Sequence, residues 1–194
     1  MIDIESICVF CGSKKGVDPT HAQAARDFGQ AIAARGVKLI YGGGRIGLMG
    51  IIANEVARNN GAVTGVIPDF LMHLEVGNPD AGELIITESM HTRKAQMFQL
   101  SDAIVIFPGG LGTLDEAFEV ITWKQLCQHK KPIVLVDING YWKAFNDLIH
   151  SIVDGGYAHK KVLDLFSVVQ RVEDIFSAIT NAPCPNQVVL TSHL

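Results

Sequence analysis

The chain of 194 residues lacks the features that would direct it to a membrane or to nucleic acid. Its 16 Lys and Arg are outnumbered by 20 Asp and Glu, and a net charge of −4 gives no support for a basic nucleic-acid surface. No apolar run approaches the roughly 20 residues that a membrane-spanning helix needs. The start, Met1-Ile2-Asp3-Ile4-Glu5, is acidic and lacks the basic region of a secretory signal. We therefore expect a cytoplasmic protein that binds neither membranes nor nucleic acid.

Cysteine is scarce and poorly placed for redox or metal chemistry. Cys8 and Cys11 form a CxxC string inside an apolar run that predicts a strand, so their side chains should point to opposite faces. In redox proteins this motif opens a helix, and a zinc site would need a second well-spaced pair of ligands. Cys127 and His129 are poor candidates for that pair. We expect buried structural cysteines, no metal and no cofactor, with a redox or zinc role as the alternative.

Other catalytic signatures and domain boundaries are also absent. No serine elbow, no Ser/His/Asp order and no lysine context typical of a pyridoxal phosphate Schiff base is visible, and there is no internal repeat, low-complexity segment or linker. A chain of this length is expected to form one domain. We place it at residues 1–181, followed by a tail at 182–194 that is rich in turn-forming residues.

What the chain does contain is a regular alternation of apolar strands with helices. This order predicts a doubly wound α/β fold, with a mostly parallel sheet of about seven strands and helices on both faces. Asp18 and Pro19 are expected to begin the first helix. The expected strands are 6–11, 37–41, 62–67, 83–87, 103–107, 132–136 and 166–170. The expected helices are 19–35, 48–59, 90–100, 114–127, 141–154 and 172–179, with shorter helical pieces in 69–82 and 159–163.

A glycine-rich turn, Pro108-Gly109-Gly110-Leu111-Gly112-Thr113, follows the strand at 103–107 and precedes a helix. Glycines let the backbone approach a ligand, and a helix start offers unpaired N–H groups, so a phosphate is the natural occupant. A phosphate would repel a carboxylate pointing the same way, so a functional Glu116 must face another part of the ligand. The alternative is a capping box, with Thr113 as N-cap, Glu116 at N3 and Asp115 as a first-turn acid.

A second glycine turn matches a dinucleotide fingerprint, Gly42-x-Gly44-x-x-Gly47. It follows the second strand instead of the first, and Asp69 is the one nearby candidate for the acid that such a site requires. We interpret the turn as a tight turn with close helix–sheet packing, or as the second wall of a nucleotide pocket. A nicotinamide oxidoreductase remains a weaker alternative.

Arg93 and Lys94 supply positive charge at the start of the helix at 90–100, where the helix dipole disfavours cations. A solvated helix face is the usual explanation of such a pair. Their position near a strand end also suggests an anion or a carboxylate partner.

Four motifs stand in order along the chain and together resemble the LOG ("Lonely guy") family of cytokinin riboside 5′-monophosphate phosphoribohydrolases. The resemblance covers nearly the whole chain. Members have often been labelled lysine decarboxylase, although nothing in this sequence supports amino-acid decarboxylation. The motifs are Cys8-Val9-Phe10-Cys11-Gly12-Ser13, Gly42-Gly43-Gly44-x-x-Gly47-Leu48-Met49-Gly50, Met90-His91-x-Arg93-Lys94-x-x-Met97 and Pro108-Gly109-Gly110-x-Gly112-Thr113-x-x-Glu116.

The resemblance implies a Rossmann-like fold, usually a homodimer, and an N-glycosidase reaction. The substrates would be N6-substituted adenosine 5′-monophosphates, and often AMP itself, which would be hydrolysed to the free base and ribose 5-phosphate. By position, Arg93 and Glu116 would be the catalytic pair. The implied substrate-binding residues also include Gly12, Ser13, Gly43, Gly44, Glu88, Met90, Lys94, Gly109, Gly110, Gly112 and Thr113. Lys14-Lys15 depart from the family pattern, in which serine or alanine is common. The rival hypothesis is a non-catalytic nucleotide-binding or carrier protein built on the same turn.

Overall fold

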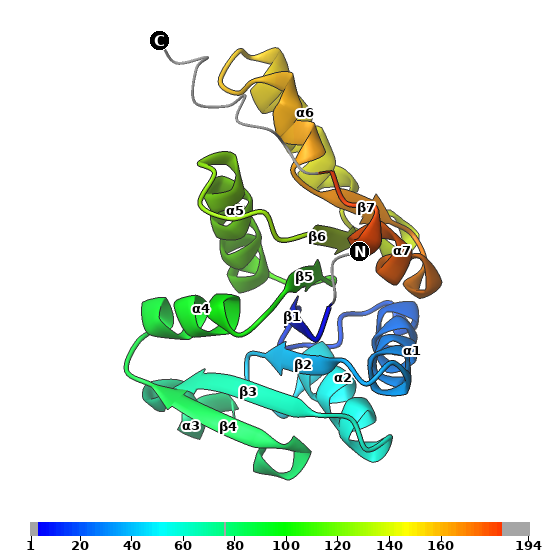
Figure 1. Ribbon diagram of the computed structural model, residues 1–194, viewed down its shortest axis with the longest axis vertical. Helices are drawn as coiled ribbons and strands as arrows, with labels where there is room; N and C mark the ends of the chain where they lie inside the picture. The colour runs from blue at the N-terminus through cyan, green and yellow to red at the C-terminus, as the bar shows by residue number, and fades with distance from the viewer. Residues whose placement is uncertain (1–3, 76, 184–194) are drawn as a thin grey trace.

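The computed structural model describes residues 4–75 and 77–183, which are built around one parallel sheet (Figure 1). Its seven strands lie in the order β4-β3-β2-β1-β5-β6-β7, and every ladder between neighbouring strands is parallel. The predicted doubly wound α/β fold is thus confirmed. The strands are β1 (Ser6–Phe10), β2 (Lys38–Tyr41), β3 (Val63–Pro68), β4 (Glu83–Thr87), β5 (Ala103–Ile106), β6 (Ile133–Val136) and β7 (Ser167–Val169).

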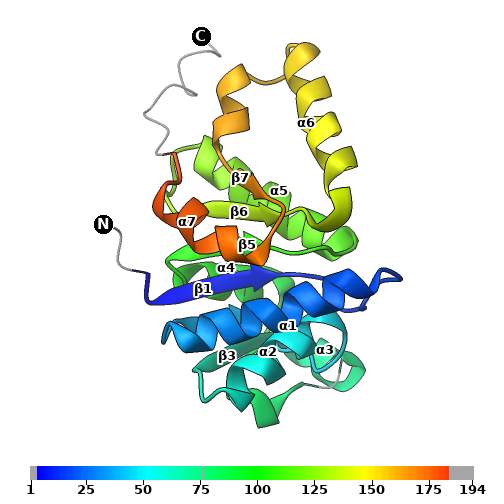
Figure 2. The same cartoon turned by 90° about the vertical axis from the view of Figure 1, so that its right-hand side faces the viewer.

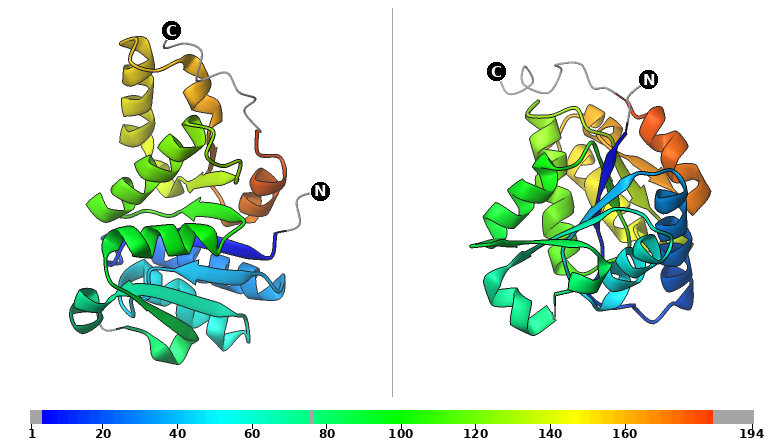
Figure 3. Two further views of the ribbon diagram at one scale, coloured as in Figure 1. Left: turned by 60° about the vertical axis from the view of Figure 1, so that its left-hand side comes forward. Right: turned by 60° about the horizontal axis from the view of Figure 1, so that its bottom comes forward.

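Helices cover both faces of the sheet, because the inner strands are apolar on both sides. On one face lie α1 (Pro19–Ala34), α2 (Gly47–Arg58) and α7 (Ile175–Thr180), which stand in front of the sheet in Figure 2. On the other lie α4 (Met90–Gln99), α5 (Leu111–Gln125) and α6 (Lys143–Asp154); α4 and α5 are nearest the viewer in the left panel of Figure 3. The remaining helical segments are α3 (Asp69–Glu75) and the short 3-10 helices Pro79–Ala81, Ile138–Gly140, Lys160–Asp164 and Val172–Asp174.

The alternation of side chains along β1 separates the two cores. Ile7 and Val9 pack with the residues of α1 and α2, whereas Cys8 and Phe10 pack with those of α4 and α5. Cys11, just beyond the strand, returns to the first core. The two cysteines are therefore buried on opposite faces, as predicted. Burial raises the pKa of both thiols well above the ordinary value, so neither is a ready thiolate.

Most predicted elements occur with shifts of a few residues, and three helices, α5, α6 and α7, begin two or three residues from the predicted start. Asp18 caps α1 as predicted, accepting a hydrogen bond from the Thr20 amide at 2.9 Å. Helix α5 begins at Leu111, three residues before the predicted start, because Gly110 in extended backbone is its N-cap. Helix α6 begins late, because a 3-10 helix with Asn139 at φ 55° precedes it.

Three further expectations concern metals, membranes and the tail. Among the described residues, no group of three or more His, Cys, Asp and Glu could hold a metal ion. No helix of the described ranges is long and apolar enough to cross a bilayer. Residues 184–194 of the predicted tail lie outside the described part of the chain.

The strand order places a crevice between β1 and β5. From β1 the chain proceeds to β2, β3 and β4 on one side, and then continues with β5 on the other side of β1. The segments that follow β1 and β5 lie side by side, since the Gly12 amide donates to the Pro108 carbonyl at 3.0 Å. In doubly wound sheets the ligand binds in this crevice, at the carboxyl ends of the strands.

Candidate functional site

An inner cavity of about 190 Å³ opens at the carboxyl ends of β1 and β5. Its walls combine backbone from the Gly12-Ser13 and Gly110–Thr113 segments with side chains from α2, α4 and α5. The side chains that carry its polar chemistry are Arg93, Thr113 and Glu116. Each is buried, although each reaches the cavity.

The turn after β5 exposes its backbone to this cavity. A Cβ atom added to Gly110 or Gly112 would meet no atom within 4 Å, so open space lies beside both glycines. Gly110 is the N-cap of α5, and the first N–H groups of a helix have no partner within it. Together with the positive end of the helix dipole, these amides suit an anion.

The predicted capping box is wrong. With Gly110 as N-cap, Thr113 occupies the third helical position, and no acid lies in the first turn. Asp115 and Glu116 belong to the second turn, further from the amides. The electrostatic conflict between a bound phosphate and these carboxylates is therefore smaller than the sequence suggested.

Gly109 has a different environment from the two glycines that follow it. A Cβ atom there would collide with the Thr113 side chain. The Gly109 carbonyl accepts a hydrogen bond from Tyr141 Oη at 2.6 Å. Gly109 therefore shapes the turn and lies outside the lining of the inner cavity.

Arg93 reaches from α4 across the carboxyl ends of β3 and β2. Its Nε donates to the Val66 carbonyl and its Nη2 to the Gly42 carbonyl, both at 3.0 Å. Arg93 is 6% exposed. A Cβ atom on Gly42 would collide with the guanidinium, so glycine is required at that position. The two hydrogen bonds hold a permanent positive charge at the cavity wall.

Glu116 lies one helical turn after Thr113 on the face of α5 that lines the cavity. It is 7% exposed. Burial is the largest cause of the raised pKa of Cys11; the Glu116 carboxylate raises it further, whereas the Arg93 guanidinium lowers it. Both charges also act on Cys8 in the same directions. Arg93, Glu116 and Cys11 all line the inner cavity.

Lys94 has carboxylate partners and lies outside the cavity lining. Its Nζ is 3.0 Å from Asp115 Oδ2 and 3.1 Å from Glu119 Oε2, with the lysine side chain 8% exposed. Burial opposes its charge, but the hydrogen bonds of the two carboxylates raise the pKa of Lys94 above its ordinary value. The predicted carboxylate partner is confirmed, and Asp115 is that partner instead of a first-turn acid. The ion pairs join α4 to α5 beside Arg93 and Glu116.

The glycine turn after β2 serves packing. Gly47 has φ 68°, and a Cβ atom there would collide with the Ser13 backbone. Gly43 has φ 77° and packs on Ile67, while Gly44 forms a bridge with Gly77. The predicted tight turn with close packing is confirmed. Gly43 and Gly44 lie outside the lining of the inner cavity, to which Gly42 contributes.

Two other candidates near the start of α4 are placed differently. Met90 lines the inner cavity, and its sulfur is 3.7 Å from Arg93 Nη1. Glu88 is exposed between β4 and α4 and lies outside that lining.

The inner cavity has an apolar wall of which Met90 alone was predicted from the sequence. Phe10, Met49 and Met97 line it together with Met90. Methionine side chains adapt to irregular surfaces and pack favourably against aromatic rings, so this wall suits a planar base. Phe10, Met49 and Met97 stand within the family motifs, but their periodicity also matches ordinary core positions, so no role was assigned to them.

An outer cavity of about 360 Å³ opens on the other side of the same backbone segments. It shares Gly12, Ser13 and Gly110 with the inner cavity. Four side chains that were not assigned to a site line it, namely Lys14, Lys15, His21 and Tyr141. His21 and Tyr141 make an edge-to-face ring contact at 5.2 Å. The lysines were visible in the sequence as a departure from the family, but the contact between His21 and Tyr141 depends on the tertiary fold.

Comparisons with known proteins agree on one family. A family model described as "Possible lysine decarboxylase" matches residues 49–179. The chain is 40% identical over 184 residues to the cytokinin riboside 5′-monophosphate phosphoribohydrolase LOG of Oryza sativa subsp. japonica, covering 95% of this chain and 71% of that protein. It is 38% identical over 183 residues to the cytokinin riboside 5′-monophosphate phosphoribohydrolase LOG3 of Arabidopsis thaliana, covering 94% of this chain and 85% of that protein.

A solved structure shares the fold at lower sequence identity. The molybdenum cofactor binding protein from the phototrophic bacterium Rippkaea orientalis superposes with a TM-score of 0.69 at 22% identity, covering 93% of this chain and 98% of that one. At this identity the likeness shows the fold alone.

Proposed function

Because the chain belongs to the LOG family of cytokinin riboside 5′-monophosphate phosphoribohydrolases, we propose that its inner cavity hydrolyses the N-glycosidic bond of adenosine 5′-monophosphates. The products are the free base and ribose 5-phosphate, and the reaction on N6-substituted nucleotides activates cytokinins. The residue assignment rests on one observation. Arg93 and Glu116 line the same cavity as the turn at Gly110 and Gly112, beside which there is open space.

The ligand spans this cavity from a phosphate to a base. The 5′-phosphate lies at the amides of the turn after β5, with Thr113 at its side. The ribose then faces Glu116, one helical turn further along α5. The base extends toward the apolar wall that includes Met90 and Met97.

Glu116 acts on the sugar. Cleavage of an N-glycosidic bond passes through a sugar with oxocarbenium character, as glycoside hydrolysis does. A carboxylate near C1′ stabilises that positive charge or orients the attacking water. The low exposure of Glu116 strengthens this interaction, because charges attract more strongly where water is excluded.

Arg93 positions the negative groups of the site. Its hydrogen bonds to the Val66 and Gly42 carbonyls hold the guanidinium in place before substrate arrives. A prearranged cation of this kind orients Glu116 or stabilises charge on the ribose or base, without reorganising during the reaction. Lys94 contributes indirectly, by joining α4 to the helix that carries Glu116.

The test is base release from AMP and from isopentenyladenosine 5′-monophosphate. We expect Glu116→Gln to lower kcat by about 10²–10⁴-fold, the usual contribution of a positioned acid–base group. Asp154→Asn is the matched control, because it removes the same charge from an exposed position on α6 and should leave kcat unchanged. Full activity of Glu116→Gln would refute its role. A wild-type protein that binds AMP but releases no base would be a carrier.

We infer that the protein works as a homodimer through the face formed by α5 and α6. An apolar groove of about 290 Å³ lies there, lined by Leu114, Phe118, Phe145 and Leu148 among others. Leu148 is 49% exposed. Leu114 and Phe118 are half-buried. An apolar groove with an exposed leucine is the kind of surface that interfaces use. Sedimentation should give a dimer for the wild type and a shift toward monomer for Leu148→Asp; a monomeric wild type contradicts the proposal.

A further inference from the structure

We propose that the outer cavity is an anion subsite for the terminal phosphate of a nucleoside 5′-diphosphate whose first phosphate lies at the glycine turn after β5. The inference rests on the proposed function, since it places the nucleoside and its first phosphate in the inner cavity. It extends the ligands of this chain beyond monophosphates.

The two cavities adjoin where they share lining residues. Gly12, Ser13 and Gly110 line both cavities, so the boundary between the cavities is backbone without large side chains. A phosphate at the amides near Gly110 already lies at this boundary. A second phosphate attached to it enters the outer cavity, while the base and ribose keep their places.

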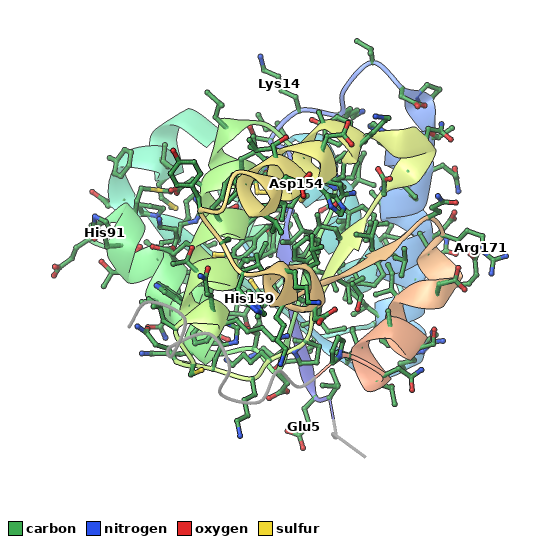
Figure 4. All side chains as sticks on the ribbon, turned by 90° about the horizontal axis from the view of Figure 1, so that it is seen from above. Glu5, Lys14, His91, Asp154, His159 and Arg171 are labelled. Carbon is green, nitrogen blue, oxygen red and sulfur yellow. The ribbon has the colours of Figure 1, made fainter. Side chains whose placement is uncertain are left out.

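The charge of the outer cavity fits a phosphate. Lys14 and Lys15 are exposed and line the cavity, and no ion pair joins either of them to a carboxylate of residues 4–75 or 77–183. His21 adds a ring that is 6% exposed. Figure 4 shows Lys14 projecting from the edge of the molecule.

The nearby carboxylate, Asp18, is already engaged. Its Oδ2 lies 3.9 Å from His21 Nε2 and accepts a hydrogen bond from Asn139 at 3.0 Å. Its Oδ1 accepts from the Thr20 amide and hydroxyl. Asp18 is outside the cavity lining, and the polar side chains of that lining carry positive charge or hydrogen-bond donors.

The outer cavity holds no group suited to the glycosidic step. Glu116 and Arg93 line the inner cavity and are absent from the lining of the outer one. The subsite therefore affects which nucleotides bind, and the reaction remains at the inner cavity. A diphosphate should occupy the same site as a monophosphate and compete with it.

Competition against isopentenyladenosine 5′-monophosphate tests the subsite. Release of isopentenyladenine is measured with AMP, ADP or inorganic phosphate as competitor, since any base released from the competitors is adenine and is distinguishable. We expect ADP to inhibit at least as well as AMP. In the double variant Lys14→Ser/Lys15→Ser, the Ki of ADP relative to that of AMP should rise roughly fivefold to tenfold, the value of two exposed charge pairs.

The matched control is Lys160→Ser/Lys161→Ser. It removes the same two charges from the 3-10 helix Lys160–Asp164, next to His159, which Figure 4 shows far from Lys14. The ratio should not change in this control. The proposal is overturned if the Ki ratio is unchanged in the Lys14/Lys15 variant or if it rises equally in both variants. It is also overturned if ADP does not bind.

Two further outcomes separate related ideas. If the Lys14/Lys15 variant loses inhibition by inorganic phosphate while its ADP-to-AMP ratio is unchanged, the cavity binds free phosphate and the diphosphate proposal is wrong. If the wild type releases no base, the proposed function fails. The subsite is then tested separately, by calorimetric titration of the three proteins with ADP. Tighter ADP binding by the wild type and the control than by the Lys14/Lys15 variant supports the subsite. Equal ADP binding by all three proteins overturns it.

Discussion

The glycine turn after β2 and the glycine turn after β5 each follow a buried strand and precede a helix at the same edge of the sheet, but their glycines face different surroundings. In the first, added Cβ atoms at Gly42 and Gly47 would collide with Arg93 and with the Ser13 backbone. In the second, added Cβ atoms at Gly110 and Gly112 would meet nothing within 4 Å. The first turn needs glycine because protein atoms fill the adjacent space. The second leaves space for a ligand.

The difference shows why a glycine motif alone is weak evidence for a nucleotide site. The turn after β2 has the dinucleotide-like string, yet it packs against the segment that follows β1. The turn after β5 carries the open helix start. Replacing glycine by alanine should therefore change the free energy of unfolding in opposite directions in the two turns.

The largest effect is expected at Gly112 in the open turn. Gly112→Ala should raise the free energy of unfolding by up to about 1 kcal/mol, because alanine favours a helix over glycine. Base release should fall by about 10²-fold, because the methyl group occupies space beside the phosphate and misplaces the substrate. Urea unfolding and kcat/KM measure the two effects. An unchanged kcat/KM would show that the ligand does not occupy the open space beside Gly112.

A smaller effect, on stability, is expected at Gly47 in the packed turn. Gly47→Ala should lower the free energy of unfolding by about 2–3 kcal/mol, since it combines left-handed backbone strain with a collision against Ser13. Gly156→Ala is the control, because Gly156 has φ 77° but no atom within 4 Å of an added Cβ. The control isolates the backbone strain, and an equal loss in both variants would argue against the collision.

The ion pairs of Lys94 hold the helix of the open turn, and their removal should have the smallest effect. Lys94→Met should lower the free energy of unfolding by about 1 kcal/mol, since the exposure of Asp115 weakens one of the pairs. Lys143→Met, which removes an exposed pair with Asp147, should change stability little. Equal losses in the two variants would contradict a special role for Lys94.

The raised pKa of Lys94 adds a pH signature. A lysine with a pKa higher in the folded than in the unfolded state contributes its stability below the unfolded value. That contribution is lost as pH rises through the folded value. Stability of the wild type should therefore fall more steeply above about pH 10.4 than that of Lys94→Met. Parallel pH dependences would show that the ion pairs add no stability.

The sequence predicted the sheet well, because buried parallel strands are continuous apolar runs and short connections order them. It failed at the start of α5, where a glycine within the first turn opposes helix propensity and hides the true N-cap. The two-sided burial of Cys8 and Cys11 followed from strand alternation.

Arg93 and Glu116 lie in motifs that follow strand ends, so the sequence could predict that they meet in one cavity. The partners of Lys94 could be stated only as a class, because Asp115 and Glu119 lie more than 20 residues away on another helix. His21 and Tyr141 were not identified, since they are 120 positions apart in the chain and meet only in the folded structure. Met49 and Met97 stand in the family motifs, but their apolar periodicity fits a core as well as a cavity wall.

The residues around Asn139 and Tyr141 connect three distant parts of the chain at the mouth of the cavities. Asn139 donates to Asp18 and Thr20, and Tyr141 donates to the Gly109 carbonyl. The hydrogen bonds from Thr20 and Asn139 lower the pKa of Asp18 to about 2. A lowered pKa stabilises the fold above the ordinary carboxyl range, and this contribution disappears only as pH falls through about 2. Asp18 should therefore still be mostly ionised at pH 3, where carboxylates with ordinary pKa values are largely protonated, and an NMR titration of its carboxyl carbon measures this difference.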